Sequence, residues 1–391
     1  MPPSPGPGPE PPETEYDVAV IGGGPAGAAA GWQAAGAGLR VALLERDALP
    51  RDKVCGEFLS GEAEPLLAEM APAFAAGAPR IGRAAFIAPG GRRGEFMLPR
   101  TALGVPRWEL DASLWQAAGR TGCKLRARHW VRACQPLGAE GFEVSGDVLP
   151  AGARFALRAR AVIVAAGRWW SIGGLRSAAP AEATAWIGVK AHLRDQTATA
   201  GGEGVIEMYY FPGGYCGLAP LGGGVWNACC LLHPGMAREL GDSADLVACL
   251  SHAARSSALR RRLRDCEQIT ATVATAPVHL RGAPAAAGAV PFAGDAAGFL
   301  DPFTGAGMAR ALLGGALAGE TVARALHRGE PLAAAARDYA KHLEAGWRRP
   351  YRWAAALRHL VLAPSWMQTS AGALLSLGPL AQRAAAATRW Q

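Results

Sequence analysis

The sequence has no hydrophobic run long enough to span a membrane. Apolar runs such as residues 161–166 have the length of a strand, whereas a transmembrane helix needs about 20 apolar residues. Residues 1–13 are rich in proline, contain two acidic residues and lack the apolar core of a signal peptide, so we expect a disordered tail. These absences predict a cytoplasmic protein without a transmembrane segment.

The eight cysteines lack the spacing of a metal or redox site. No Cys-x-x-Cys pair occurs, Cys229 and Cys230 are adjacent, and the others are scattered, which favours free thiols and predicts no metal site. The net charge is +8, but the arginines are dispersed apart from a cluster at residues 260–264. We therefore expect no nucleic-acid partner.

What the chain does contain is a strand that runs into a glycine-rich turn, at residues 16–21. Gly22 permits a sharp turn, Gly24 leaves room for a pyrophosphate, and Gly27 lets the following helix pack closely on the strand. Glu45 ends a second strand about 20 residues later, where its carboxylate can bind a ribose diol. The pattern predicts a bound dinucleotide with its phosphates at the helix N-terminus, and not an ordinary loop.

The pattern of apolar and polar residues changes twice further along the chain. Between residues 184 and 276, alternating segments separated by glycine turns predict an antiparallel sheet. Residues 289–295 return to the character of a buried strand and lead into a long helix at about 305–328. A chain of 391 residues is also long enough for two cores.

These patterns predict an α/β fold in which a Rossmann-like, discontinuous nucleotide-binding domain is combined with an α+β substrate domain built on an antiparallel sheet. The expected divisions are a tail at 1–13, a nucleotide-binding domain at 14–80, 100–183 and 280–330, a substrate domain at 81–99 and 184–279, and a helical C-terminal extension at 331–391.

Two motifs together resemble a known family. The glycine turn with Glu45 is paired with Gly294-Asp295-Ala296-Ala297-Gly298 and with residues 301–308, Asp-Pro-Phe-Thr-Gly-Ala-Gly-Met. This pair resembles the FAD-dependent oxidoreductases of the para-hydroxybenzoate hydroxylase and geranylgeranyl reductase superfamily, which includes the flavin-dependent halogenases. The resemblance covers nearly all of residues 16–330 and implies that FAD is the cofactor.

The resemblance also implies which residues hold FAD. Asp295 would accept a hydrogen bond from the ribityl chain, backbone N–H groups near Gly305 and Gly307 would approach the flavin ring, and Arg107 would contact the cofactor beside a helix at 109–120. The full expected set is Gly22, Gly24, Ala26, Gly27, Glu45, Arg46, Arg107, Val131, Gly167, Gly294, Asp295, Gly305, Gly307 and Met308.

The geranylgeranyl reductase-like group is the nearest match within the superfamily. Its members carry a Cys-Gly pair near the flavin, as at Cys55 here, which implies a catalytic thiol; the alternative is a small buried apolar residue. The strands around residues 209–218 resemble its substrate sheet. They imply a substrate pocket, whereas the alternative is simple filling of a sheet core; the residues concerned are Tyr210, Phe211, Tyr215 and Asn227.

The sequence differs from the motifs of the aromatic hydroxylases and of the halogenases, which weakens the resemblance to these two groups. Aromatic hydroxylases carry Asp-Gly after the buried strand and Ala-Ala-His after the second Gly-Asp, where this chain has Ala166-Gly167 and Gly298. The Trp-x-Trp-x-Ile motif of the halogenases is also missing, because Trp169 and Trp170 are adjacent.

The sequence thus predicts an oxidoreductase that passes electrons from a reductant, expected to be NAD(P)H bound transiently, through FAD to a hydrophobic unsaturated substrate of isoprenoid or polyketide character. One alternative is a monooxygenase that hydroxylates an aromatic or polyene substrate through a flavin hydroperoxide. A second is an electron-transfer flavoprotein with a protein partner. The basic, aromatic segment 347–362 adds the alternatives of peripheral membrane contact or packing on its own domain.

Overall fold

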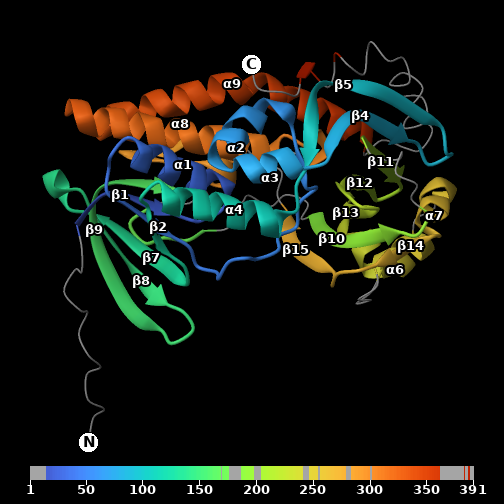
Figure 1. Ribbon diagram of the computed structural model, residues 1–391, viewed down its shortest axis with the longest axis horizontal. Coiled ribbons are helices and arrows are strands. Elements are labelled where there is room, and N and C mark those ends of the chain that lie inside the picture. The colour runs from blue at the N-terminus through green and yellow to red at the C-terminus, as the bar shows by residue number, and fades with distance from the viewer. Residues whose placement is uncertain are drawn as a thin grey trace, which may run out of the picture.

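A computed structural model describes most of the chain. It covers residues 15–168, 170–175, 186–197, 204–240, 246–253, 256–278, 283–299 and 302–361, together with residues 383, 386 and 387. The tail expected at 1–13 lies outside these residues. Figure 1 shows two sheets side by side, with the long helices α8 and α9 running above the first sheet.

The first sheet has six strands in the order β6-β2-β1-β9-β8-β7. Strand β1 lies at its centre and pairs in parallel with β2 and β9, and β2 pairs in parallel with β6. The apolar run at 161–164 forms the end of β9 and is buried on both faces. The strand bounds are β1 Glu15–Ile21, β2 Val41–Leu44, β6 Lys124–Arg126, β7 His129–Pro136, β8 Phe142–Val148 and β9 Ala153–Val164.

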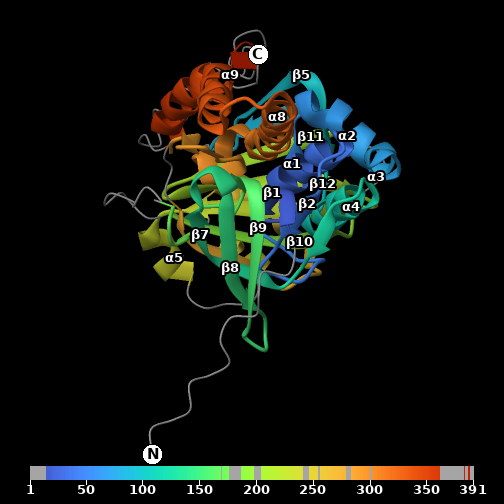
Figure 2. The same ribbon diagram turned by 90° about the vertical axis from the view of Figure 1, so that its left-hand side faces the viewer.

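Helices from distant parts of the sequence cover this sheet. Helix α1, Pro25–Gly36, packs against α8, Gly307–Arg328, and a Cβ atom on Gly315 or Gly319 would overlap a backbone carbonyl of α1. Small residues therefore allow the two helices to approach closely. Figure 2 shows the hairpin of β8 and β9 extending away from α8 and α9.

The second sheet has nine strands in the order β14-β10-β13-β12-β11-β4-β5-β3, with β15 also paired to β10. It is antiparallel as predicted, except that β11 pairs with β4 in parallel. Its strand bounds are β3 Phe58–Leu59, β4 Arg80–Ile87, β5 Arg93–Gly104, β10 Trp186–Asp195, β11 Val205–Phe211, β12 Gly214–Gly222, β13 Val225–Leu232, β14 Cys266–Gln268 and β15 Val273–Val278.

The two faces of this sheet have different neighbours. One face packs on α6, Leu246–Ala253, and α7, Ser257–Leu263, through a core that includes Tyr209 and Phe211 of β11. The other face turns toward the first sheet and carries Met208 and Tyr210. Strand alternation therefore decides which side chains face the first sheet.

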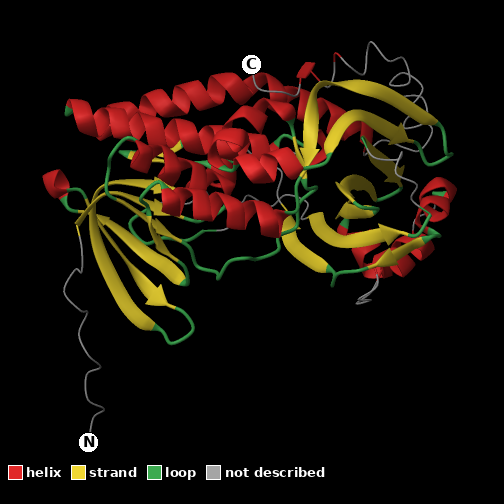
Figure 3. Cartoon of the chain, in the orientation of Figure 1, coloured by secondary structure: helices red, strands yellow, loops and turns green. Residues whose placement is uncertain are grey.

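The remaining elements are short, apart from α4 and α9. Figure 3 shows the long helices on one side of the first sheet and further helices at the far side of the second sheet. Their bounds are η1 Gly61–Ala63, α2 Glu64–Met70, α3 Pro72–Gly77, α4 Arg107–Arg120, η2 Gly138–Glu140, α5 Pro234–Leu240, β16 Ala286–Ala287, β17 Val290–Pro291, η3 Gly294–Ala297, η4 Pro302–Thr304 and α9 Leu332–Val361.

Helix α9 packs into the core of the first sheet. Tyr339 and Trp347 are each only 1% exposed, and the Tyr339 hydroxyl donates a hydrogen bond to the Phe292 carbonyl. Residue 362, the last of the basic segment 347–362, lies outside the described residues, as do residues 363–382. In the part of the chain that is described, no helix has both the length and the apolar character to cross a bilayer.

Candidate active site

The three motif glycines of the N-terminal turn have different structural roles. Gly22 has φ 108°, and a Cβ on Gly22 or Gly27 would overlap a backbone carbonyl oxygen, of Ala165 and Gly22 respectively. These two glycines are therefore needed for folding. A Cβ on Gly24 would meet only the Arg51 guanidinium, at 3.9 Å.

Open space over Gly24 coincides with an uncapped helix end. Helix α1 begins at Pro25, directly after Gly24, and has no side-chain cap on its first N–H groups. An anion placed there would meet unpaired N–H groups and the positive end of the helix dipole. The turn therefore fits the pyrophosphate of FAD.

Glu45 lies next to this turn. Its side chain is buried, accepts hydrogen bonds from the backbone N–H groups of Gly23 at 2.7 Å and Asp47 at 2.9 Å, and forms an ion pair with Arg51. The neighbouring Arg46 side chain is half exposed and stacks over Trp130. The carboxylate is thus fixed at the end of β2, where a ribose would lie.

The second motif forms a tight turn beneath α8. Gly294 has φ 62° and opens the helical turn η3, whose carbonyl oxygens accept hydrogen bonds from the buried Arg310 guanidinium. Arg310 donates to the carbonyls of Gly294, Ala297 and Gly298 at 2.6–2.8 Å. The sequence did not indicate this arginine, which fixes the position of Asp295.

Asp295 faces a cavity between the two sheets. Burial raises the pKa of its carboxyl above the ordinary value of 3.8, although the guanidinium groups of Arg168, Arg310 and Arg107 oppose the shift. A carboxylate in this setting gains from a hydrogen-bond donor, which a ribityl hydroxyl can supply. The turn fits the ribityl end of FAD.

The other predicted cofactor positions are arranged around these two turns. Gly305 has φ 67°, and a Cβ there would lie 2.7 Å from the Phe58 ring, whereas a Cβ on Gly307 would meet nothing within 4 Å. Gly167, with φ 80°, follows β9 and has open space beside it. The Met308 side chain is buried in a core that it shares with α2.

Three further residues of the predicted cofactor set, Ala26, Val131 and Arg107, are buried or paired within the protein. Ala26 is buried under Gly294 and Gly315, and Val131 is buried in β7. The sequence predicted a helix at 109–120, with Arg107 two residues before it. In the structure Arg107 is itself the first residue of α4. Its guanidinium makes two 2.9 Å hydrogen bonds to the fully buried Asp111.

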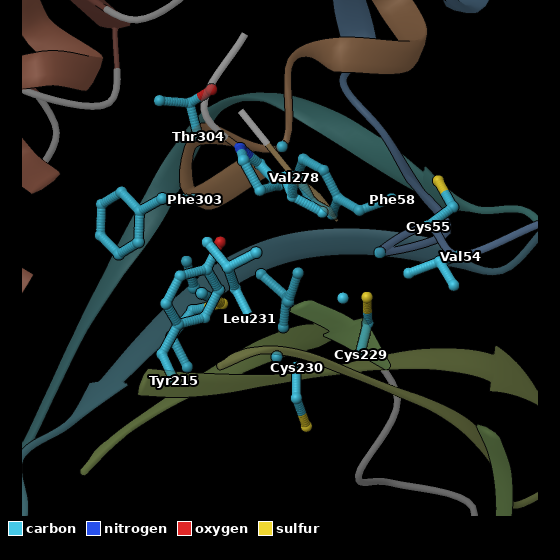
Figure 4. A pocket seen from close by; sticks show the side chains of 18 of the residues that line it. Val54, Cys55, Phe58, Tyr215, Cys229, Cys230, Leu231, Val278, Phe303 and Thr304 are labelled. Atoms are coloured by element: carbon cyan, nitrogen blue, oxygen red, sulfur yellow. The ribbon is translucent and has the colours of Figure 1, made fainter. Parts of the chain in front are cut away.

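The cavity has a volume of about 180 Å³ and joins the Asp295 turn to the second sheet (Figure 4). Its polar side chains are Arg168, Thr275, Asp295, Thr304, the Tyr215 hydroxyl and three thiols, those of Cys55, Cys229 and Cys230. The rest of its wall is mostly apolar and aromatic, as in a site for a hydrophobic ligand. The apolar lining includes Val54, Phe58, Phe86, Phe96, Leu98, Ile206, Met208, Tyr215, Leu231, Val278, Phe299 and Phe303.

Aromatic rings form one end of this cavity. The Phe86 ring lies 5.5 Å from Phe96, 5.9 Å from Tyr210 and 5.8 Å from Phe303 between centroids, and Tyr215 meets Phe303 edge to face. These rings come from β4, β5, β11, β12 and η4. Stacked rings of this kind form a rigid apolar surface.

The predicted substrate residues divide between several places. Tyr215 lines the cavity, and Tyr210 packs behind Phe86. Phe211 is a correction: it follows Tyr210 on β11 and therefore points to the opposite face, into the core with α6 and α7. The Asn227 amide donates to the carbonyl of Cys55 at 3.0 Å, so it supports the cavity wall without lining the cavity.

Cys55 lines the cavity, and its side chain is shown with that of Cys229 in Figure 4. Burial raises the pKa of the Cys55 thiol above 9.0, although the Arg107 guanidinium acts in the opposite direction. The thiol is therefore protonated at neutral pH and carries a proton that can be donated. Within the described ranges, no group of His, Cys, Asp and Glu side chains has the arrangement of a metal site.

Four polar or charged side chains near the site were not found from the sequence. Arg51 lies beside Gly24, and Glu57, Lys190 and His192 form a buried cluster behind Cys55. Only the Lys-x-Cys-Gly-Glu spacing at 53–57 could have drawn attention to Glu57. Its two partners are remote in sequence.

Comparison with known proteins agrees with this geometry. The chain is 29% identical over 359 residues to digeranylgeranylglycerophospholipid reductase 2 of Methanopyrus kandleri, covering 87% of this chain and 85% of that protein. It is 27% identical over 354 residues to digeranylgeranylglycerophospholipid reductase 1 of Methanothermobacter thermautotrophicus, covering 83% and 81%.

Solved structures share the fold at low sequence identity. The flavin-dependent brominase Bmp2 matches with a TM-score of 0.77 and 19% identity, over 97% of this chain and 95% of that one. A geranylgeranyl bacteriochlorophyll reductase-like protein of Thermoplasma acidophilum matches with a TM-score of 0.73 and 20% identity, over 93% and 92%. The family model for the FAD binding domain matches residues 15–330. The chain therefore belongs to the FAD binding domain family and is an FAD-dependent oxidoreductase of geranylgeranyl reductase-like character.

Proposed function

We propose that this enzyme reduces carbon–carbon double bonds of a hydrophobic, isoprenoid-like lipid. The observation that carries the proposal is one continuous cavity that joins the Asp295 and Gly305 turns to the aromatic end at Phe86 and Phe96. A hydrophobic chain in this cavity would lie beside the flavin site. Bound FAD, once reduced, supplies a hydride.

Reduction of a double bond also needs a proton for the second carbon. Cys55 is a thiol on the cavity wall, and burial keeps it protonated by raising its pKa. We assign it the role of proton donor, and the resulting thiolate is reprotonated from solvent. The oxidised cofactor is restored by hydride from NAD(P)H, which binds transiently.

The names of the two archaeal relatives support a lipid substrate, since both are digeranylgeranylglycerophospholipid reductases. The nearly apolar cavity lining supports it as well, because polar substrates would leave their groups unpaired there. The positions we assign to FAD follow from the two turns. They are Gly22, Gly24, Ala26, Gly27, Glu45, Arg46, Arg107, Val131, Gly167, Gly294, Asp295, Gly305, Gly307 and the backbone of Met308.

The experiment that tests the proposal compares turnover with and without oxygen. Enzyme reduced with dithionite is mixed anaerobically with isoprenoid lipids, and products are identified by mass spectrometry. We expect gain of two hydrogens per double bond and no need for oxygen. A product with an added oxygen atom and substrate-dependent oxygen consumption would show a monooxygenase instead.

A matched pair of variants tests the thiol. Cys55→Ala should lower turnover by about a hundredfold, the scale of a lost general acid, while FAD content stays the same. Cys134→Ala removes a buried thiol of the first sheet that does not line the cavity, and should leave turnover unchanged. Undiminished turnover in the Cys55 variant would exclude this role.

A further inference from the structure

The wall segment 54–58 has one side chain that does not face the cavity. Val54, Cys55, Gly56 and Phe58 line the cavity, whereas the carboxylate of Glu57 is fully buried on the other side. Glu57 has φ 52°, a left-handed conformation that non-glycine residues rarely adopt. Such a conformation persists only where the surroundings hold it firmly.

Three groups from two elements hold the Glu57 carboxylate. Its Oε1 atom accepts hydrogen bonds from the Arg107 backbone N–H at 2.7 Å and from Lys190 Nζ at 2.5 Å. Its Oε2 atom lies 2.6 Å from His192 Nε2. Lys190 Nζ also donates to Asp52 at 2.5 Å. Both carboxylate oxygens are thus occupied, by α4 and by strand β10.

Charge explains why this cluster is rigid. The Lys190 and Glu57 side chains have no exposed surface. Burial opposes the charge on Lys190, but the carboxylates of Glu57 and Asp52 outweigh it and raise the pKa of the amine. Loss of one partner would leave the other as an unpaired buried charge, which is strongly unfavourable.

The register of the second sheet connects the cluster with the cavity. Lys190 and His192 lie opposite Cys229 and Asn227 on β13. Cys229 lines the cavity, and the Asn227 amide donates to the Cys55 carbonyl at 3.0 Å. The sheet that forms part of the cavity therefore also holds segment 54–58 at two points, the Glu57 carboxylate and the backbone carbonyl of Cys55.

We infer that Glu57, Lys190 and His192 are positioning residues that hold the Cys55 thiol in place on the cavity wall. The catalytic meaning of this position rests on the proposed function, in which Cys55 donates a proton. The cluster itself does not contact the cavity and acts through segment 54–58. It fixes this segment relative to both α4 and β10.

The test measures the accessibility of Cys55 in the purified holoenzyme. Glu57→Ala and Lys190→Met variants are treated with N-ethylmaleimide, and modification of each cysteine is followed by peptide mass spectrometry. We expect Cys55 to react about tenfold faster or more once a charged hydrogen bond is lost, because the segment opens more often. Glu57→Gln, which keeps the shape, should show a smaller increase.

Internal references separate this local effect from general loosening. Cys123 and Cys134 are buried in the core of the first sheet, so their rates should not change. Glu207→Ala is the matched control variant. Its carboxylate also lies in the second sheet but pairs with Arg93 and Arg262 on the face opposite the cavity, so Cys55 should react as in the unaltered enzyme.

Unchanged Cys55 reactivity in both Glu57→Ala and Lys190→Met would overturn the inference, and so would equal acceleration of all three cysteines. If Glu57→Ala does not fold, Lys190→Met decides. The outcome is independent of the proton-donor role. Full turnover in Cys55→Ala would remove that role while selective exposure of Cys55 would still support the positioning cluster.

Discussion

The Glu45 carboxylate accepts a 2.7 Å hydrogen bond from the backbone N–H of Gly23. This contact joins the end of β2 to the glycine turn, 22 residues away in sequence. The turn and the acid are therefore held together by the protein itself, so that little rearrangement is needed to place a ribose and a pyrophosphate beside them.

The space beside Gly24 gives a prediction about cofactor retention. Gly24→Val should fold but lose FAD, because its side chain would fill the open space at the N-terminus of α1. Flavin absorbance per protein after gel filtration measures the loss. Gly36→Val, at the exposed end of the same helix, is the control and should keep its flavin. A yellow Gly24→Val protein would contradict the assignment.

The positive charge of Arg51 should strengthen FAD binding. Arg51→Met is expected to weaken FAD binding roughly tenfold or more, the scale of one charged hydrogen bond, since the arginine lies beside Gly24 and neutralises Glu45. The loss should be smaller in high salt. Titration of the apoprotein with FAD measures it. Arg40→Met, an exposed arginine at the other end of β1, should have no effect; an equal loss there would refute the local explanation.

Asp295 should affect cofactor binding and apoprotein stability in opposite directions. Asp295→Asn is expected to weaken FAD binding by about 1–3 kcal/mol, because a hydrogen bond to the ribityl chain is impaired. Burial raises the pKa of this carboxyl, so the folded state binds its proton more tightly than the unfolded chain does. Ionisation therefore lowers stability as the pH rises from 3.8 through the folded pKa.

The Asp295→Asn variant has no carboxylate to ionise, so it avoids this loss of apoprotein stability. Without FAD, Asp295→Asn should melt at the same or a higher temperature than the unaltered protein at neutral pH, and the difference should vanish at low pH. Thermal unfolding followed by circular dichroism at several pH values measures this. A neutral-pH melting temperature well below that of the unaltered apoprotein would show that the carboxylate stabilises the fold.

The Cys55 thiol should react slowly with alkylating reagents at neutral pH. Burial raises its pKa above 9.0, and only the thiolate is the nucleophile. The rate of N-ethylmaleimide modification at Cys55, followed by peptide mass spectrometry between neutral pH and the onset of unfolding, should still be rising at pH 9.0. A plateau reached near neutral pH would mean that the Arg107 guanidinium outweighs burial.

Membrane contact through α9 can be tested without disturbing the core. Truncation before Leu343 would remove that residue and Trp347, which are both buried, so we expect it to destabilise the protein. Trp353 is 42% exposed on the same helix. If α9 contacts lipid, Trp353→Ser should reduce flotation with anionic liposomes, whereas Trp108→Ser, exposed on α4, should not. Equal flotation of both variants would argue against contact through this face.

Several elements could be predicted because their signals are local. The strand, glycine turn, helix and acid at the N-terminus lie within about 30 consecutive residues, as expected of a βαβ unit, and the structure shows β1, α1, β2 and Glu45 there. The long helix at 305–328 is confirmed, with its first residue at Gly307. Predictions of this kind succeed because short-range backbone constraints decide them.

The substrate face was harder to predict, because strand neighbours decide it. Tyr210 and Phe211 are adjacent and both aromatic, yet only one can face the first sheet. Tyr215, on the next strand, lines the cavity. An aromatic run by itself does not state which of its members point to a ligand.

The sequence by itself determined the dinucleotide-binding turn, because glycine is needed wherever a phosphate must approach the backbone, and the resemblance carried by the two motifs implied FAD. Tertiary structure alone decided how the cavity wall is held. Glu57 meets Lys190 across 133 positions and His192 across 135, and Asn227 meets the Cys55 carbonyl across 172. Buried charges and amides of this kind are paired by strand order and register, which no local pattern of residues encodes.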